Sequence, residues 1–273
     1  MAARVYLSDR EGHPFTLGRC LLDRLGSQED QMQATLTFTN TAVVCLARTE
    51  SGGLPLAHSP LCPCRAFCSQ YKVDFQHSAK VELCVQGLVE SLDGLYLVVR
   101  QELHLMQYPK AWGTLGAALG PSEAMEQVLV RKLENVGIKL TATQGGLWYQ
   151  QSPCELMPFY MYENTFPVRL DLGLPAIQQL QVFMHIKIPA TARSLRLTTK
   201  AEVDIAVWLS PGQVRDIEAG LLETVEGVWR GNKSCKVSYL QLSGSAPNAV
   251  GEGWSMPSLA ALQHWLLCRG SLL

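Results

Sequence analysis

The stretch GAALGPSEAMEQVLVRKLENVGI, from Gly116 to Ile138, decides how this chain folds. A glycine-rich turn leads into a Pro-Ser-Glu start, in which Ser122 is placed to cap a helix and acidic residues follow in the first turn. Gly137 is placed to end the helix in the left-handed conformation. An apolar stripe at three- and four-residue spacing lies between these signals: Met125, Val128, Leu129, Leu133 and Val136. We therefore predict an amphipathic helix from about Ser122 to Gly137.

Composition limits the classes of protein to which the chain can belong. Its 273 residues suit one large domain, or one domain of typical size with extensions. Hydrophobic residues make up 47% and charged residues 17%, so we expect a globular core. The formal net charge of −1 gives no long-range attraction to nucleic acid, so we expect no DNA partner, and an RNA partner would need a local basic groove. The apolar runs are too short to span a bilayer, and we expect no membrane partner.

The cysteines indicate a reducing compartment. There are nine, an odd number, and several lie inside apolar runs such as TAVVCLA and VELCVQG, where Cys acts as a small hydrophobic residue. A disulfide framework would instead pair an even number. We therefore expect a cytoplasmic or nuclear protein, and the oligomeric state stays unknown.

Around the opening stretch, the chain alternates strand and turn signals. Residues 80–91 and 95–102 are β-rich and are joined at Leu-Asp-Gly, which predicts a hairpin. We expect a strand pair over 34–47, a loop over 51–64 and a flexible linker over 244–258, followed by a final helix over 258–270. Further strands are expected over 146–151, 158–164, 180–188 and 202–209, and a helix over 209–225. This order predicts a mixed sheet flanked by helices, an α/β fold.

The residues around the predicted helix resemble the core of the Nudix hydrolases. In that family a strand ending in Arg is followed by a Trp and then by a glycine-rich box. Downstream, residues 163–188 and 200–211 are similar to the nucleoside diphosphate-linked moiety X motif 17 subfamily. The matching positions, with one residue missing before the last glycine, are Arg100, Trp112, Gly116, Pro121, Glu123, Arg131, Leu133, Gly137 and Ile138.

This resemblance implies a Nudix-type α/β/α sandwich over residues 78–225. Residues 1–77 would then form an N-terminal extension of strands and loops, and residues 226–273 a C-terminal strand, linker and helix. The box scaffold would consist of Gly116, Glu123, Arg131, Leu133 and Gly137, with a structural pairing of Glu123 and Arg131.

The resemblance also implies a divalent-metal site, and there the sequence departs from the family. Nudix enzymes activate water between divalent cations, and hard cations such as Mg²⁺ need several carboxylate oxygens. The family's Arg-Glu position is Lys132 here, and only Glu134 remains of the following acids. In a regular helix, at about 100° per residue, Glu134 falls roughly 20° from Glu123 and Lys132 about 180° from it. A regular helix therefore points Glu134 away from the metal, and only a local tightening would return it.

Three functions stay open. The first is a Nudix-fold protein with a degraded metal site that binds a nucleotide or a partner and hydrolyses poorly. The second is an active hydrolase of nucleoside diphosphate-linked compounds that needs Mg²⁺ or Mn²⁺, for which the resemblance implies capped RNA as a substrate class. In that case Glu134 and Glu202 are the candidate catalytic and metal-binding residues, and Arg100, Trp112 and Tyr162 the candidate substrate contacts. The third is an interaction module that docks through the C-terminal helix, although Leu259, Leu262 and Leu266 also suit a core-covering face.

Other chemistry-bearing residues are less specific. Glu163, Asp171 and Asp204 could supply further acids, but such residues are commonly solvated or capping. The loop His58-x3-Cys62-x-Cys64-x3-Cys68 holds four possible zinc ligands, yet its spacing is cramped compared with two separated ligand pairs. We therefore expect no zinc there. His104 and His185 have no nucleophile beside them, and His185 suits a sheet position.

Overall fold

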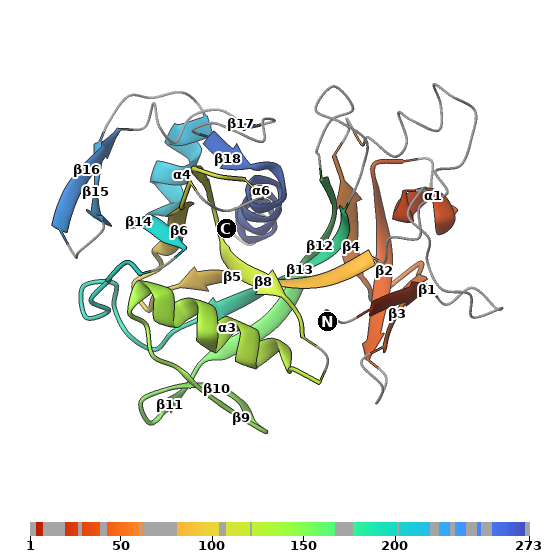
Figure 1. Ribbon diagram of the computed structural model, residues 1–273, viewed down its shortest axis with the longest axis horizontal. Helices are drawn as coiled ribbons and strands as arrows, with labels where there is room; N and C mark the ends of the chain where they lie inside the picture. Colours follow the sequence, from red (N-terminus) through yellow and green to blue (C-terminus); the bar gives the residue numbers. More distant parts are fainter. Residues whose placement is uncertain are drawn as a thin grey trace. The chain divides into compact units, whose positions relative to one another are not determined.

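The computed structural model forms two compact units (Figure 1). The first comprises residues 1–85, 118–124 and 158–183, and the second residues 86–117, 125–157 and 184–273. Both units are assembled from separated segments, and the sequential domain boundaries at residues 77 and 225 stay a prediction. The structure describes residues 4–7, 20–26, 29–38, 43–59, 62, 81–103, 108–120, 122–166, 177–200, 202–218, 224–229, 233–238, 245–246 and 253–270. The predicted residues Cys64, Cys68, His104, Pro121 and Asp171 lie outside these ranges.

The first unit is built on a sheet of mostly short strands. The predicted strand pair is confirmed: Thr37 lies opposite Cys45 in an antiparallel ladder. In sheet order the strands are β1 (Arg4–Leu7), β3 (Val43–Arg48), β2 (Gln31–Phe38), β4 (Leu54–His58), β12 (Glu155–Phe166) and β13 (Ile177–Lys187), with a short helix α1 (Leu21–Arg24).

The loop expected over residues 51–64 is wrong in part, because β4 lies within it. Gly and Pro on both sides of Leu54–His58 hide the strand signal in the sequence. In the structure β4 pairs antiparallel with β2 and parallel with β12, with Met161 opposite Leu56. Two neighbouring strands satisfy the backbone of β4 on both edges and bury its last three residues.

The second unit contains an antiparallel sheet on which the box helix packs. The predicted hairpin is confirmed, with Val89 opposite Leu97 and a turn closed by the Ser91 N–H donating to the Leu95 carbonyl at 2.9 Å. In sheet order the strands are β5 (Val81–Glu90), β6 (Tyr96–Gln101), β14 (Val203–Leu209), β15 (Thr224–Trp229) and β16 (Lys233–Ser238). β7 (Ala111–Gly113) pairs with β6, and β8 (Leu115–Ala118) follows it. A separate small sheet consists of β9 (Thr141–Thr143), β10 (Gly146–Tyr149) and β11 (Ser152–Pro153).

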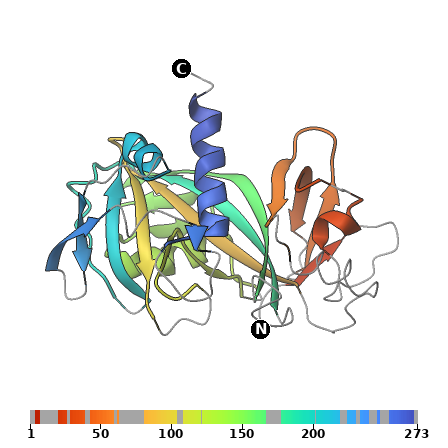
Figure 2. The same ribbon diagram turned by 90° about the horizontal axis from the view of Figure 1, so that it is seen from above.

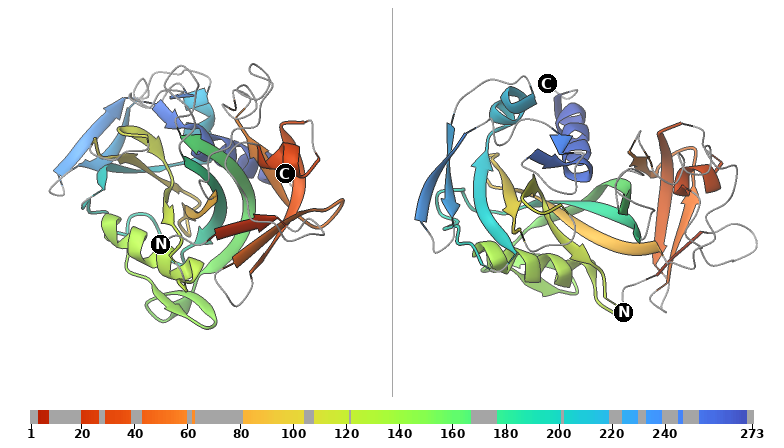
Figure 3. Two further views of the ribbon diagram at one scale, coloured as in Figure 1. Left: turned by 45° about the vertical axis from the view of Figure 1, so that its right-hand side comes forward. Right: turned by 45° about the horizontal axis from the view of Figure 1, so that its top comes forward.

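Helices cover both faces of the sheet in the second unit (Figure 3). A Cβ on Gly87 would meet Leu129 of α3 (Met125–Leu133) and Ile186, each at 3.0 Å, so α3 packs on the face that carries Ile186. His185, the preceding residue of β13, stacks on Trp265 of α6 (Met256–Gly270) with ring centroids 4.1 Å apart. Because neighbouring residues of a strand point to opposite faces, α3 and α6 lie on opposite sides. The predicted α/β/α architecture with a mixed sheet and a C-terminal helix is therefore confirmed.

The box helix starts later than predicted. α3 begins at Met125, and Ser122 lies in a turn with φ of 63°, outside any helical conformation. The Glu123 carboxylate accepts a hydrogen bond from the Gly120 N–H at 2.9 Å, which closes the turn before the helix. Glu123 thus stabilises this turn in the position where we expected a Ser122 cap.

The C-terminal part corrects two further expectations. The predicted linker contains β17 (Ser245–Ala246) and β18 (Gly253–Ser255), and β18 pairs parallel with β7. The Gly and Ser content of this segment suggests flexibility. In the structure Trp254 is buried, and its burial holds the segment in place. The helix predicted over 209–225 is α4 (Pro211–Glu218), and Thr224 and Val225 instead begin β15. α6 runs without interruption toward the C-terminus (Figure 2). Within the described residues, no helix has both the length and the apolarity needed to cross a membrane.

Candidate functional site

The end of the box helix is fixed against the segment that leads into β14. After Leu133 the helix tightens into a 3₁₀ turn, Glu134–Val136, and Gly137 has the predicted left-handed conformation with φ of 83°. The Thr198 N–H donates to the Val136 carbonyl at 3.0 Å, and the Lys200 N–H to the Asn135 carbonyl at 2.9 Å. A Cβ at Gly137 would lie 2.5 Å from Thr198 Oγ1, so glycine is required here for space as well as for φ.

This arrangement brings Lys132 to Glu202. The Lys132 ammonium donates to Glu202 Oε2 in a short ion pair. Lys132 is buried with 8% exposure, whereas the Glu202 side chain is 39% exposed. The carboxylate predicted as a metal ligand thus already has a cationic partner from the position where the resemblance implies a carboxylate.

Glu134, the other predicted metal ligand, is exposed, whereas Lys132 is buried. The helix does tighten, as a metal-binding role for Glu134 would require, but the 3₁₀ turn starts at Glu134 itself. Its side chain remains exposed to solvent. The fold brings Lys132 into an ion pair with Glu202, and Glu134 as a metal ligand stays a prediction.

The residues present do not fit a Mg²⁺ or Mn²⁺ site of the kind that the resemblance implies. Such ions need several convergent carboxylate oxygens, two of them commonly from the box helix. Here the helix contributes the buried ammonium of Lys132 and an exposed Glu134. A divalent cation beside Glu202 would either displace Lys132 or meet its positive charge at short range.

A second polar cluster surrounds Asp204, which lies in β14 two residues after Glu202. Arg100 on β6 donates to Asp204 Oδ2 through Nη2 at 2.6 Å and Nε at 3.0 Å, and Lys110 Nζ donates to the same oxygen at 2.7 Å. Trp229 Nε1 on β15 donates to Oδ1 at 2.7 Å. Register explains this convergence, because Ile205, next to Asp204, lies opposite both Arg100 and Trp229.

Burial alone would raise the pKa of Asp204, but these donors hold that pKa below its usual value. Asp204 is therefore a buried, ionised acid and not the solvated or capping residue that is common among lone acids. In this cluster Arg100 and Lys110 carry two positive charges against the single negative charge of Asp204. This small excess of positive charge suits an anionic ligand better than a metal ion.

The predicted substrate contacts differ in accessibility. Arg100 lies over the Trp112 ring at 5.9 Å, and Trp112 itself is fully buried. The ring that solvent can reach in this cluster is Trp229, which is 47% exposed and which sequence reasoning missed. Tyr162 belongs to the other compact unit, where it is 2% exposed in β12. Substrate contacts by Arg100, Trp112 and Tyr162 stay predictions.

The remaining scaffold residues take ordinary positions. Leu133 is buried at the end of α3, Arg131 is exposed on the same helix, and Gly116 lies in β8. The Glu123–Arg131 pairing stays a prediction. Lys110, which sequence reasoning also missed, stands two residues before Trp112 with φ of 62°, and no pattern in the sequence marks it as a partner of Asp204.

Comparison with known proteins agrees with the resemblance of the box residues to the Nudix core. No family model matches the chain. The chain is 24% identical over 236 residues to the m7GpppN-mRNA hydrolase NUDT17 of Danio rerio, covering 83% of this chain and 71% of that protein. It is 25% identical to the proteins of the same name from Bos taurus and Homo sapiens, of which it spans 57% and 52%. The chain resembles the motif 17 subfamily of the Nudix superfamily.

Solved structures of Nudix proteins also align with the chain. A MutT/nudix family protein from Enterococcus faecalis has a TM-score of 0.40 at 11% identity, covering 76% of this chain and 69% of that one. The E. coli ORF135 protein has a TM-score of 0.39 at 16% identity, covering 71% and 94%. The fold assignment rests on the strand order and on the helices on both faces of the sheet, described above.

Proposed function

We propose that this protein binds a nucleoside diphosphate-linked ligand without hydrolysing it by divalent-metal catalysis. The observation that carries the proposal is the Lys132–Glu202 ion pair. A Nudix site holds its cations with carboxylates, whereas here an ammonium already neutralises Glu202. One covalently held positive charge can stabilise phosphate oxygens, but it cannot lower the pKa of a bound water as a metal ion does.

The charge and the aromatic ring around Asp204 support the class of ligand. Lys110 is 30% exposed at its side chain, and Arg100 and Lys110 together exceed the single charge of Asp204. The exposed Trp229 ring offers a stacking surface for a base. The relatives' name, m7GpppN-mRNA hydrolase, suggests a capped RNA or a cap-like dinucleotide as the ligand to test first.

Active hydrolysis is the second candidate, favoured by two observations. Glu202 is retained and partly exposed, and the helix tightens at Glu134. In that case Mg²⁺ or Mn²⁺ would bind through Glu134 and Glu202 after Lys132 had moved away. Action in the cytoplasm or nucleus is part of this proposal and rests on the cysteine pattern alone.

Thermal unfolding with ligand tests the binding proposal. The full chain is melted with the cap dinucleotide m7GpppG or with ADP-ribose, each with and without Mg²⁺. A ligand that binds only the folded chain stabilises it by about 2.7 kcal/mol at 100 times its Kd, so the melting temperature should rise equally with and without the metal. Lys110→Gln should weaken this rise, whereas Lys139→Gln, which removes an exposed lysine elsewhere, should leave it unchanged. A rise that requires Mg²⁺ would contradict the proposal.

A further inference from the structure

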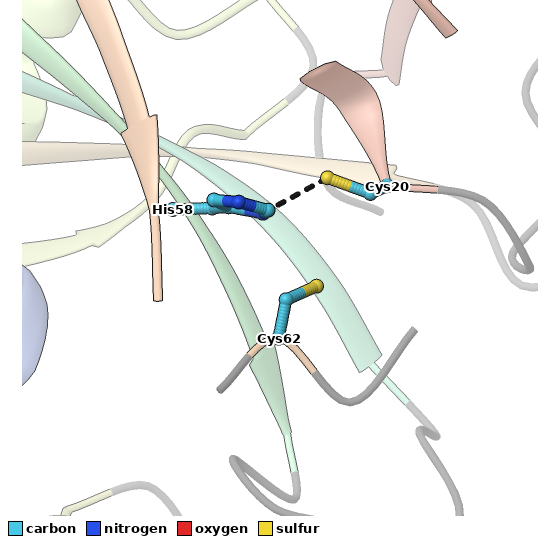
Figure 4. Close-up of side chains that lie close together, drawn as sticks. All are labelled: Cys20, His58 and Cys62. Carbon is cyan, nitrogen blue, oxygen red and sulfur yellow. Dashed lines mark hydrogen bonds between the residues drawn. The ribbon is translucent and has the colours of Figure 1, made fainter. Parts of the chain in front are cut away.

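In the first unit, three metal-ligating side chains from distant parts of the sequence meet. Cys20 precedes α1, His58 ends β4, and Cys62 follows β4 (Figure 4). Their ligand atoms all lie within 4.8 Å of one another, and all three residues are buried. Cys20 Sγ lies 2.9 Å from His58 Nδ1. We propose that Cys20, His58 and Cys62 bind one Zn²⁺ ion, with Glu163 as the fourth ligand.

The cluster needs only a small adjustment to hold a tetrahedral ion. With Zn–S near 2.3 Å and Zn–N near 2.0 Å, neighbouring ligand atoms of a tetrahedral site lie roughly 3.3 to 3.8 Å apart. Cys20 Sγ lies closer than this to His58 Nδ1, at 2.9 Å, and to Glu163 Oε2, at 3.0 Å, so the side chains would move apart by less than about 1 Å to admit the ion. Glu163 Oε2, 3.9 Å from His58 Nδ1, lies beside the group of three and would move into the fourth position. Two sulfurs, one imidazole nitrogen and one oxygen form a set that favours zinc over the harder cations Mg²⁺ and Ca²⁺.

The imidazole is oriented as in known zinc sites. His58 Nε2 lies 3.0 Å from Asp30 Oδ1, so a proton on Nε2 leaves the lone pair of Nδ1 directed at the two thiols. A carboxylate that fixes the other nitrogen of a ligating histidine is the usual second partner in such sites. The position of His58 is also held by its backbone, since its N–H donates to the Asp30 carbonyl at 3.4 Å.

The charge of the cluster supports the same inference. Glu163 is 2% exposed, and within the described part of the chain its only cationic partner is His58 at 3.9 Å. The Leu21 N–H at 2.9 Å and the Gln178 amide at 2.5 Å donate to its two oxygens. These neutral donors stabilise the single negative charge of the carboxylate. A Zn²⁺ ion with two thiolates, one carboxylate and one neutral imidazole has the same net charge of −1, so the bound ion would add no uncompensated charge to the buried cluster.

In the sequence, His58 and Cys62 share one short loop with Cys64 and Cys68, which lie outside the described residues. Among the described residues, the structure brings to His58 and Cys62 two partners from distant segments: Cys20, which is 38 residues before His58, and Glu163, which is 143 residues after Cys20. The resulting site joins α1, β4 and β12 within one unit. Bound metal would therefore stabilise this unit, whose sheet is made mostly of short strands.

Zinc content of the full chain tests the proposal. The protein is mixed with one equivalent of Zn²⁺ under reducing conditions, desalted, and analysed for metal by mass spectrometry. We expect about one zinc per chain. Cys62→Ser should lose it, and Cys268→Ser, a matched change at an exposed cysteine, should keep it. Co²⁺ bound in place of zinc should show thiolate-to-metal charge transfer that Cys62→Ser removes.

Two further variants keep the test independent of folding. The Asp30 side chain is 59% exposed, so Asp30→Asn should leave the fold intact and lower zinc affinity by about 10- to 100-fold in competition with a chromophoric chelator. Glu163→Gln should also lower the affinity while keeping the charge-transfer band of the thiolates. Unchanged zinc content in Cys62→Ser, absence of zinc from the reduced wild type, or a Cys20–Cys62 disulfide in the mass of the freshly isolated protein would each overturn the proposal.

Discussion

Lys132 is the single residue on which the proposed loss of the metal site depends. Sequence comparison alone identifies the substitution, because Lys stands where the box has a carboxylate. The sequence cannot say where the ammonium goes, since a lysine stem can reach solvent from most helix positions. The structure turns Lys132 inward onto Glu202 because residues 196–200 hold the end of the helix against the start of β14.

Asp204 allows a prediction about pH. Its lowered folded-state pKa means that it stabilises the fold above its unfolded pKa of about 3.9, and that this contribution is lost as the pH falls through the folded pKa. Asp204→Asn leaves Arg100 and Lys110 beside a neutral group. We expect a loss of about 3 kcal/mol in the free energy of unfolding near neutral pH, as for other broken buried pairs.

Urea unfolding of wild type and Asp204→Asn at a series of pH values measures this loss. The difference between the two proteins should begin to shrink as the pH falls below about 4, where the carboxylate of the unfolded chain takes up a proton, and should be lost below the lowered folded-state pKa of Asp204. Asp216→Asn, on the surface of α4, serves as the control and should stay within about 0.5 kcal/mol of wild type. A difference that stays constant down to the lowest pH would show that Asp204 is not an ionised partner of the two cations.

Among the elements, the end of the box helix was predicted correctly and its start was not. Gly137 ends the box helix as predicted, because a left-handed φ and the close approach of Thr198 both demand glycine. The start was misplaced because Ser122 offers a cap that the chain does not use, while Glu123 binds the Gly120 N–H instead. β4 and β18 were missed for a similar reason: Gly and Pro beside them suggest loops, and only pairing with distant strands makes them part of a sheet.

The C-terminal helix is predicted to cover the core and not to serve mainly as a docking face. Leu262 and Trp265 are buried, Leu259 and Leu266 are partly buried, and Trp265 stacks on His185, which binds Glu90 at 2.8 Å. Arg269, also on α6, donates to the other oxygen of Glu90 at 2.8 Å. Burial alone would raise the pKa of Glu90, but His185 and Arg269 hold it below its usual value.

Trp265→Ala should therefore lower the free energy of unfolding by about 3 to 5 kcal/mol, as expected for deletion of a large buried ring. Leu267→Ala, on the same helix with 72% exposure, is the matched control and should change it by less than about 0.5 kcal/mol. Chemical denaturation followed by circular dichroism measures both. Equal effects of the two substitutions would mean that α6 does not pack through Trp265.

For the whole molecule, pattern in the sequence predicted the fold class and the family resemblance, but not the organisation into units. Four strands, β5, β8, β12 and β13, contribute residues to both units, and no composition shift marks such a division. The polar clusters escaped prediction for the same reason. Arg100 and Asp204 are 104 residues apart, and Cys20 and Glu163 are 143 apart, so only the completed sheet brings them together.

We propose that an internal ion pair has replaced the metal site of a Nudix enzyme in this protein. The decisive experiment measures product release from capped RNA and ADP-ribose with Mg²⁺ and with Mn²⁺ at the same protein concentration. Wild type, Glu134→Gln and Glu202→Gln should all give product at the background rate with either metal. Metal-dependent turnover by the wild type that is lost in Glu202→Gln or Glu134→Gln would contradict the claim, because it would require Lys132 to leave Glu202 and a cation to take its place.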